Sequence, residues 1–389
     1  MEKEIFTCIY CNIELSVKES SLEHVIPQFL GGNYSSNLFK TTDVCKACNN
    51  KLGLFVDASY AKSYFVTNYL ASAARSFYTG KTCPPLPLSY MGTFSHEDIY
   101  LAEKQTIDNW LGPSGECVFW IRQKDERMYW YSGGNPTHRK TKTTAYLSLT
   151  DKPKTFELGI KSFLHKFKGK NIRKILCQEI IDDEGNSITL KGFDTPTERE
   201  KNISNKLLDT IFSKKIHLSS SIYTKFDSRF IAKLVLSIGY ILFGEKFLLT
   251  KHALAARNDL WLKKGEEEKL PKTSSLLDKD DDNLKKIMSY PGANVISIIN
   301  SGGLYYLNIT VNGSMFSTTE FASAHLISPH IDANNGLVIL LFPYLKLAIE
   351  LNFFEFILHK NGSFKHAELS KIDEIIEKSK RYWEDIKDK

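Results

Sequence analysis

Hydrophobic positions along the chain recur with two different periods, which separate helical from strand-like stretches. Between residues 58 and 77 apolar side chains return every third or fourth position, and this spacing predicts a helix. The same period predicts the following further helices: 197–212, 227–243, 247–261 and a charged one at 367–387. A helical pattern therefore accounts for much of the chain between residues 197 and 261 and for its C-terminal end.

A strand-like pattern dominates residues 94–191 and returns after residue 287. Two hairpins are expected in the first stretch, one joining 117–122 to 128–131 and one joining 175–181 to 188–191. The second stretch predicts strands at the following positions: 294–300, 304–311 and 345–353, the last with strict alternation of apolar and polar residues. We therefore expect mixed strand and helix in the middle of the chain and a β-rich C-terminal region.

The chain has 389 residues, and its length and local composition predict several domains. Residues 263–286 contain seven basic and seven acidic side chains but only four leucines, which indicates an exposed linker or loop. It would separate a mixed domain at 58–262 from a β-rich region with a terminal helix at 287–389. The apolar runs are too short to span a bilayer, and the charged start is not a signal peptide, so we expect a soluble cytoplasmic protein.

Seven cysteines are an odd number in so long a chain, which argues against a disulfide framework. Four of them form two pairs, each separated by two residues: Cys8 with Cys11, and Cys45 with Cys48. Two such pairs within about 40 residues are typical of a four-cysteine zinc site. A site closed by four thiolates has no position left for water or substrate, so the zinc would be structural and any chemistry must come from residues between the pairs.

The segment between the cysteine pairs contains acidic, histidine, glycine and asparagine residues in a recognisable order. Glu23-His24 is followed by Pro27, Gly31-Gly32 and Asn37-Leu38, and Asn49-Asn50-Lys51 comes directly after the last cysteine. This block resembles the HNH (His-Me finger) endonucleases, over residues 5 to about 57. The resemblance implies an N-terminal ββα-metal finger at 1–57 with structural zinc. Together with the mixed α/β middle region and the β-rich C-terminal region expected from periodicity, this predicts an α+β fold for the chain.

The resemblance also implies roles for individual residues. His24 would be the general base that activates water, since imidazole titrates near neutrality. Glu23, the next residue on an extended segment, points away from His24, so a second element must approach it. In the family that element is the helix starting at the last cysteine pair, whose Asn49 would hold one Mg²⁺ or Mn²⁺ together with Glu23. Asn37 would orient His24; Asn50 remains an alternative to Asn49, and Glu23 stands where many relatives have aspartate.

Basic residues are unevenly distributed. The net charge is only +6, but residues 120–175 contain fourteen Lys and Arg against four acids. Six of them crowd one short acid-free stretch and are candidate phosphate contacts: Lys161, Lys166, Lys168, Lys170, Arg173 and Lys174. The alternative is an ordinary solvated face. The neighbouring aromatic residues are expected in the core, whereas Arg229, Lys233 and Arg257 are expected on a surface that faces phosphate or only solvent.

Together these features predict a metal-dependent HNH endonuclease that cuts DNA, which we expect to be double-stranded. Restriction or antiphage defence are the settings that the family resemblance implies, with a possible homo-oligomer. Two alternatives stay open: a zinc finger that binds DNA without cutting it, and a nuclease whose C-terminal part senses a cyclic oligonucleotide or binds a protein partner. Sequence specificity and the choice between DNA and RNA are not determined by the sequence.

Overall fold

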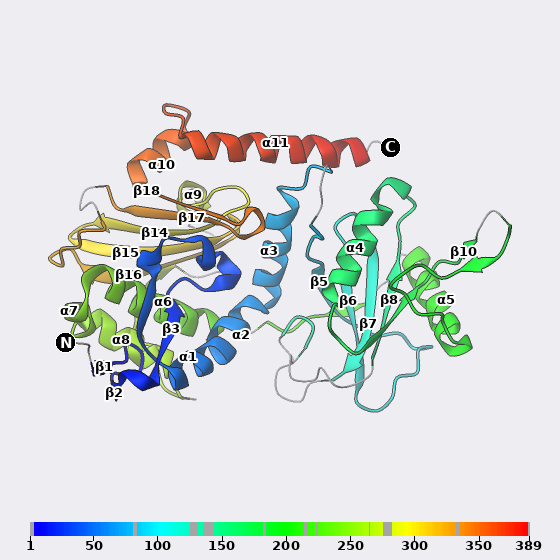
Figure 1. Ribbon diagram of the computed structural model, residues 1–389, viewed down its shortest axis with the longest axis horizontal. Helices are drawn as coiled ribbons and strands as arrows, with labels where there is room; N and C mark the ends of the chain where they lie inside the picture. The colour runs from blue at the N-terminus through cyan, green and yellow to red at the C-terminus, as the bar shows by residue number, and fades with distance from the viewer. Residues whose placement is uncertain are drawn as a thin grey trace. The chain divides into compact units, whose positions relative to one another are not determined.

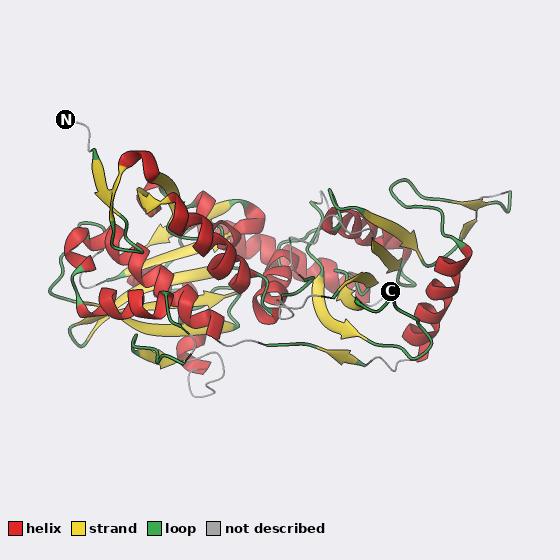
Figure 2. Cartoon of the chain, turned by 90° about the horizontal axis from the view of Figure 1, so that it is seen from below, coloured by secondary structure: helices red, strands yellow, loops and turns green. Residues whose placement is uncertain are grey.

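The computed structural model describes residues 4–80, 84–124, 131–134, 143–181, 184–213, 217–222, 225–263, 265–274, 282–331 and 335–387. The chain forms two compact units (Figures 1 and 2). The first combines Met1–Ala61 with Thr224–Arg381, and the second combines Lys62–Tyr223 with Tyr382–Lys389. The predicted division into 1–57, 58–262, 263–286 and 287–389 follows chain order instead, and it stays a prediction about domains.

The first unit begins with small β-hairpins and a helix. Its N-terminal elements are β1 (Ile5–Thr7), β2 (Glu14–Ser16), β3 (Ser20–His24), β4 (Lys40–Cys45), α1 (Lys46–Leu52), a π-helical turn (Gly53–Asp57) and α2 (Ala58–Ala61). β1 pairs with β2 and β3 with β4, both antiparallel. Short 3₁₀ turns connect β3 to β4, at Gln28–Leu30, Gly32–Tyr34 and Asn37–Phe39. The ββα arrangement therefore consists of β3, β4 and α1.

A six-stranded antiparallel sheet forms the C-terminal part of the first unit. Its order is β13 (Lys272–Ser274), β16 (Met315–Ser323), β15 (Leu304–Val311), β14 (Asn294–Ser301), β17 (Leu337–Phe342) and β18 (Leu347–Leu351). The accompanying helices are α6 (Lys225–Phe243), α7 (Glu245–Leu248), α8 (Lys251–Leu260), α9 (Asp282–Ile287), α10 (Phe353–Lys360) and the start of α11 (Ala367–Lys387). Helices α6 and α8 lie against this sheet through β16 (Figure 1).

Two local differences from the predicted elements have clear causes. One helix was expected at 247–261, but the structure has α7 and α8, because Thr250 caps the second helix through a hydrogen bond from the Ala253 amide to its Oγ1 (3.2 Å). The segment expected as a linker contributes β13 to the sheet. It is also anchored by the Asp259 carboxylate, which accepts hydrogen bonds from the amides of Lys269 (2.7 Å) and Leu270 (2.9 Å).

The second unit is built on another six-stranded sheet. Its order is β12 (Leu218–Ser219), β5 (Ser89–Phe94), β6 (Gln105–Leu111), β7 (Cys117–Gln123), β8 (Thr143–Ser148) and β9 (Ile172–Leu176), and only β8 and β9 are parallel. The other elements are α3 (Tyr64–Arg75), α4 (Phe156–Lys166), α5 (Glu198–Ser213) and the short pair β10 (Ile180–Ile181) and β11 (Ser187–Ile188). The predicted α+β class is confirmed, with mixed strand and helix in this unit.

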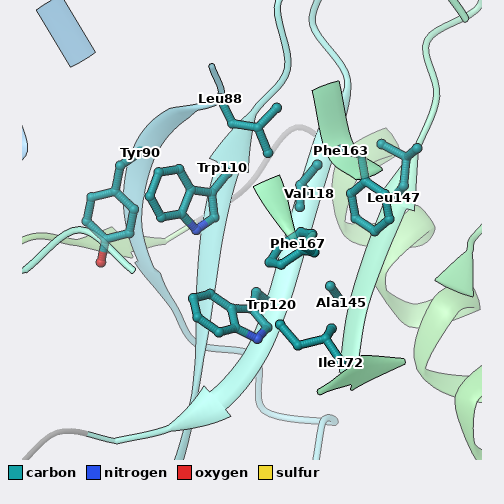
Figure 3. Packing of buried hydrophobic residues seen from close by; sticks show 10 residues of the cluster. All are labelled: Leu88, Tyr90, Trp110, Val118, Trp120, Ala145, Leu147, Phe163, Phe167 and Ile172. Atoms are coloured by element: carbon teal, nitrogen blue, oxygen red, sulfur yellow. The ribbon is translucent and has the colours of Figure 1, made fainter. Parts of the chain in front are cut away.

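Helices cover both faces of the second sheet. Phe163 and Phe167, from α4 and the residue after it, pack with Trp110 and Trp120 on one face (Figure 3). Leu207 of α5 packs on the other face. The expectation that the aromatic residues near the basic segment form core is confirmed for those described, since Trp120, Phe163 and Phe167 are all at least nine-tenths buried.

Helix α4 lies inside a stretch that the sequence analysis had assigned mostly to strands, so that prediction was wrong there. The parallel pairing of β8 with β9 explains the helix, because parallel neighbours need a crossover connection. Of the two expected hairpins, the one at 175–191 is present as the short pair β10 and β11. In the other, residues 128–130 lie outside the described residues, and β7 pairs with β6 and β8.

Candidate HNH active site

The four paired cysteines come together, as the sequence predicted. Cys8 and Cys11 follow β1, Cys45 ends β4 and Cys48 lies in the first turn of α1. Their Sγ atoms all lie within 4.8 Å of one another. Thiolates around a tetrahedral zinc ion, with Zn–S bonds of about 2.3 Å, stand about 3.8 Å apart. The donor set and its spacing are therefore compatible with zinc.

The thiols of this cluster differ in pKa. A hydrogen bond from the Cys48 thiol lowers the pKa of Cys8 to about 4, and the same contact raises the pKa of Cys48. Backbone amides add to the stabilisation of negative sulfur: the Cys45 amide donates to Cys8 Sγ and the Cys48 amide to Cys45 Sγ, both at 3.4 Å. The surroundings thus favour the thiolate form of Cys8, the form that binds metal, whereas burial raises the pKa of Cys11.

The cysteine-bearing loop is held by helices from far along the chain. The indole of Trp261 donates to the Tyr10 carbonyl (3.0 Å), and Arg257 donates to the Ile9 carbonyl (3.4 Å). From α6, the Tyr240 hydroxyl donates to the Asp43 carboxylate on β4 (2.6 Å). The ββα finger is therefore an integral part of the first unit and does not stand apart from it.

The two glycines after β3 are required by the backbone. Gly31 has a φ of 107°, a conformation that L side chains rarely adopt. A Cβ atom on Gly32 would lie 1.7 Å from the Ile26 carbonyl oxygen. The close approach found at Gly32 is thus to the protein's own backbone.

Glu23 and His24 end β3 and differ in environment. Glu23 is 4% exposed, whereas His24 is only partly buried. Within the described part of the chain, the His24 imidazole makes no hydrogen bond. The Glu23 carboxylate receives two partners on the same oxygen: the Tyr10 hydroxyl donates to Oε1 (2.9 Å), and Lys233 Nζ lies 2.9 Å from Oε1. The other oxygen, Oε2, accepts no hydrogen bond from the residues that the structure describes.

Lys233 connects Glu23 to a second carboxylate. Its Nζ donates to Asp57 Oδ2 (2.6 Å), and its side chain is 2% exposed. Burial lowers the pKa of Lys233, but Asp57 and Glu23 raise it by more, so the net pKa is raised and the ammonium stays charged. Burial raises the pKa of Asp57, although Lys233 opposes that effect. Asp57 Oδ1 is buried and has no hydrogen-bond partner among the described residues.

Lys233 corrects one expectation and extends the site. The sequence analysis placed Arg229, Lys233 and Arg257 on a surface, but Lys233 is fully buried in its pair of carboxylates. Arg229 and Arg257 donate to the carbonyls of Leu262 and Ile9. Sequence reasoning also missed Tyr10 and Asp57 at the site. A signal for Lys233 existed, because it is the one charged residue in the apolar stretch 230–243 of α6, and a lysine is seldom fully buried unless it is paired.

Asn49 lies on α1 beside β3. Its Nδ2 donates to the Ser21 hydroxyl (3.1 Å) and to the Leu22 carbonyl (3.0 Å), the residue immediately before Glu23. No side-chain hydrogen bond of the alternative, Asn50, occurs among the described residues. The structure thus places Asn49 beside the end of β3, and its role as the partner of Glu23, with Asn50 as the alternative, stays a prediction.

The side chain of Asn37, expected to orient His24, contacts a different residue. It begins the 3₁₀ turn before β4, and its Oδ1 accepts a hydrogen bond from Lys40 Nζ (2.8 Å). Lys40 is the residue that pairs with His24 across the two strands. Asn37 makes no hydrogen bond to His24 in the described structure, so the orienting role assigned to Asn37 stays a prediction.

The oxygen atoms of Glu23 and Asp57 are of the type that binds hard divalent cations. Asp57 Oδ1 is buried and has no hydrogen-bond partner among the described residues, and Asn49 of α1 donates to the carbonyl of Leu22, next to Glu23. Mg²⁺ and Mn²⁺ prefer such carboxylate and amide oxygens. When bound, the ion would be held by Glu23 and Asn49 and would neutralise developing negative charge on a phosphate.

The six basic residues between 161 and 174 differ in how available their side chains are to a phosphate. Lys161 pairs with Glu157, and Arg173 pairs with Glu200 (2.7 Å), which lowers the pKa of that carboxyl to about 2 against the opposing effect of its partial burial. Lys166 Nζ lies 3.5 Å from the centre of the Trp110 ring.

The remaining three of the six, Lys168, Lys170 and Lys174, have different surroundings. Lys170 Nζ lies 4.8 Å from the centre of the Trp120 ring. Lys168 is exposed and makes no ion pair with a described residue, and Lys174 is half-buried, with its backbone amide bound to Asp194. Lys168 is thus the residue of this set most available to a phosphate, and the assignment of all six to a nucleic-acid interface stays a prediction.

Residues 8–65 match the model of the HNH endonuclease family. Together with the four-cysteine cluster, this match identifies that part of the chain as an HNH endonuclease domain, and an HNH domain implies nuclease activity on nucleic acid. No curated protein and no solved structure matches the chain. Among the described residues, every helix is too short or too polar to cross a membrane.

Proposed function

We propose that the protein is a metal-dependent endonuclease that hydrolyses phosphodiester bonds of double-stranded DNA at the HNH domain. The observation that supports this most is the position of three residues on two elements: Glu23 and His24 end β3, and Asn49 of α1 reaches the adjacent Leu22 carbonyl. The structural zinc held by the four cysteines would fix β4 against α1 and so fix this geometry. Mg²⁺ or Mn²⁺ would be the second metal, held by Glu23 and Asn49.

His24 is the general base of the proposed reaction. Its neutral imidazole takes a proton from water, and the water oxygen forms a bond to phosphorus while the bond from phosphorus to the 3′ oxygen breaks. The 3′ oxygen leaves with the bonding electrons and takes a proton from solvent. The products are a 3′-hydroxyl and a 5′-phosphate, and a divalent ion supplies charge neutralisation of the phosphate. The partial exposure of His24 leaves it accessible to water and substrate.

The central test is cleavage of supercoiled plasmid by the zinc-loaded protein. We expect nicked and linear products in Mg²⁺ and in Mn²⁺, and none in excess EDTA. Single-stranded DNA and RNA of the same length, added separately, test the preference for duplex DNA. Plasmid that is bound but never cut, under any metal, would instead support the alternative of a DNA-binding zinc finger without catalysis.

We further propose a cytoplasmic role in restriction or antiphage defence, for which the family resemblance is the only support. The same plasmid assay addresses the ligand-gated alternative. Cleavage that needs an added cyclic oligonucleotide would support gating by a nucleotide, whereas cleavage by the protein alone argues against gating. Sedimentation in both conditions tests whether a homo-oligomer forms.

DNA capture is proposed for the basic segment, with Lys168 as its most available cation. Lys168→Gln is expected to lower the slope of log affinity against log salt by about 1, because one phosphate contact and its counterion release are lost. Filter binding with a catalytically inactive protein, from low to high salt, measures this slope. Lys191→Gln is the matched control, since Lys191 is also exposed in the second unit but lies outside the segment. Equal slopes for the two variants would exclude Lys168 from the interface.

A further inference from the structure

Helix α6 places one charged side chain in a buried, apolar setting. Its residues from Ile231 to Ile238 are almost entirely enclosed, and Lys233 is among the largest fully buried side chains of the described chain. Removing an ammonium group from water is costly unless it is paired and hydrogen-bonded. Lys233 therefore occupies this position at an energetic cost that packing alone does not explain.

The partners of Lys233 both lie at the HNH site. Its Nζ contacts Glu23 Oε1 at 2.9 Å and Asp57 Oδ2 at 2.6 Å, and so joins the end of β3 to the end of the turn that follows α1. The Tyr10 hydroxyl donates to the same Glu23 oxygen at 2.9 Å. Two donors thus fix Oε1, which settles the orientation of the whole carboxylate, while Oε2 accepts no hydrogen bond from a described residue.

The charges around Glu23 also suit a divalent ion. Glu23 and Asp57 are two acidic groups beside the one ammonium of Lys233, so the group carries one net negative charge when both carboxyls are ionised. A negative charge attracts a cation, and the ammonium prevents the two carboxylates from facing each other unpaired. The matched residues 8–65 include Tyr10, Glu23 and Asp57, whereas Lys233 lies far outside them.

We propose that Lys233 is a positioning residue of the nuclease site, which holds Glu23 through Oε1 so that Oε2 is presented to the divalent ion. This inference rests on the proposed function, because it takes Glu23 as a ligand of that ion. Outer partners that orient a metal ligand change metal affinity when they are removed, typically by about 10–100-fold. Lys233 is thus a residue of α6 that completes a site whose other members come from the N-terminal finger.

Metal binding and cleavage should be measured separately on zinc-loaded protein. Titration calorimetry with Mn²⁺ gives the affinity, and Glu23→Gln identifies the signal from this site. We expect Lys233→Met to bind Mn²⁺ about 10–100-fold more weakly than wild type, because Glu23 loses its fixed orientation. Half-maximal plasmid cleavage should need a similarly higher Mg²⁺ concentration. Lys246→Met is the matched control, since Lys246 is exposed on α7, and it should behave as wild type.

The opposite outcome would overturn the proposal. If Lys233 competed with the ion for Glu23, Lys233→Met would bind Mn²⁺ more tightly than wild type and would cleave at lower Mg²⁺. Unchanged Mn²⁺ affinity would equally exclude a positioning role. Wild-type protein that neither binds Mn²⁺ at the Glu23 site nor cleaves DNA contradicts the proposed function itself, and so is distinguished from a failure of the positioning role alone.

A second variant covers the case in which Lys233→Met does not fold, since it leaves two buried carboxylates without a counterion. Tyr10→Phe removes only the hydroxyl that donates to Glu23 Oε1 and keeps the ring that packs there. It should keep the zinc content and melting curve of wild type and bind Mn²⁺ about tenfold more weakly, at the low end of the range for outer partners. Wild-type Mn²⁺ affinity in Tyr10→Phe would show that fixing Oε1 does not matter.

Discussion

His24→Ala is expected to lower the rate of plasmid cleavage by about 10²–10⁴-fold, the range that a general base contributes. The folded structure should be unaffected, because the imidazole is partly exposed and makes no hydrogen bond to a described residue. Single-turnover cleavage at saturating Mg²⁺ measures the chemical step. Zinc content and the melting curve should equal those of wild type, which shows that the loss is chemical and not structural.

The comparison needs a histidine with no assigned role. His325 is exposed in the first unit, and among the described residues only its backbone amide makes a hydrogen bond. His325→Ala should therefore cleave as wild type does. Wild-type rates for His24→Ala would contradict the assignment of the base and would direct attention to another group at the end of β3.

Removing zinc should have the largest effect on stability. Structural zinc sites contribute about 10–16 kcal/mol of apparent binding free energy at neutral pH, more than most domains have in total stability. Cys48→Ser, or a strong chelator, is therefore expected to unfold β1 to α1 and to abolish cleavage. Hydrogen exchange followed by mass spectrometry should show lost protection over residues 8–52. Bound zinc should fall from about one ion per chain to none.

The second unit provides the internal control. Its sheet contains none of the clustered cysteines, so its protection should survive zinc loss. Cys117→Ser changes a cysteine of that unit which packs against its core, and this variant should keep zinc and nuclease activity. Full protection of residues 8–52 in zinc-free protein would show that the contacts from α6 and α8 suffice to fold the finger.

The finger could be predicted from sequence because its determinants are local. One ion can bind all four clustered cysteines only if β4 and α1 meet at the second pair, Cys45 and Cys48. Gly31 and Gly32 mark a turn whose backbone has no room for side chains. These requirements appear as fixed spacings within about 40 residues, and spacing is what a single sequence displays. The α+β class followed equally from local periodicity.

Contacts across long stretches of sequence could not be predicted in this way. The apolar stretch around Lys233 marks this residue as unusual, but its partners Asp57 and Glu23 lie far away in the sequence and cannot be identified from it. Helix α4 was missed because its short apolar pattern lies between strands, and the parallel pairing that requires a crossover is not visible in the sequence. The basic segment was read as one charged surface, but Arg173 is held by Glu200, and Lys166 lies over an indole ring.

The ion pair between α6 and the finger also sets an order of events during synthesis. Lys233 follows Asp57 by 176 residues, and nearly all of the second unit is translated between them. At about 5–20 residues per second, the ribosome needs on the order of 10–35 s to make that stretch. The four-cysteine cluster can bind zinc as soon as residues 8–48 have been made, but Glu23 has no ammonium partner until α6 has been made. If the proposed function holds, a nascent chain therefore carries an incomplete site until α6 has been made, and cleavage would begin only after that point.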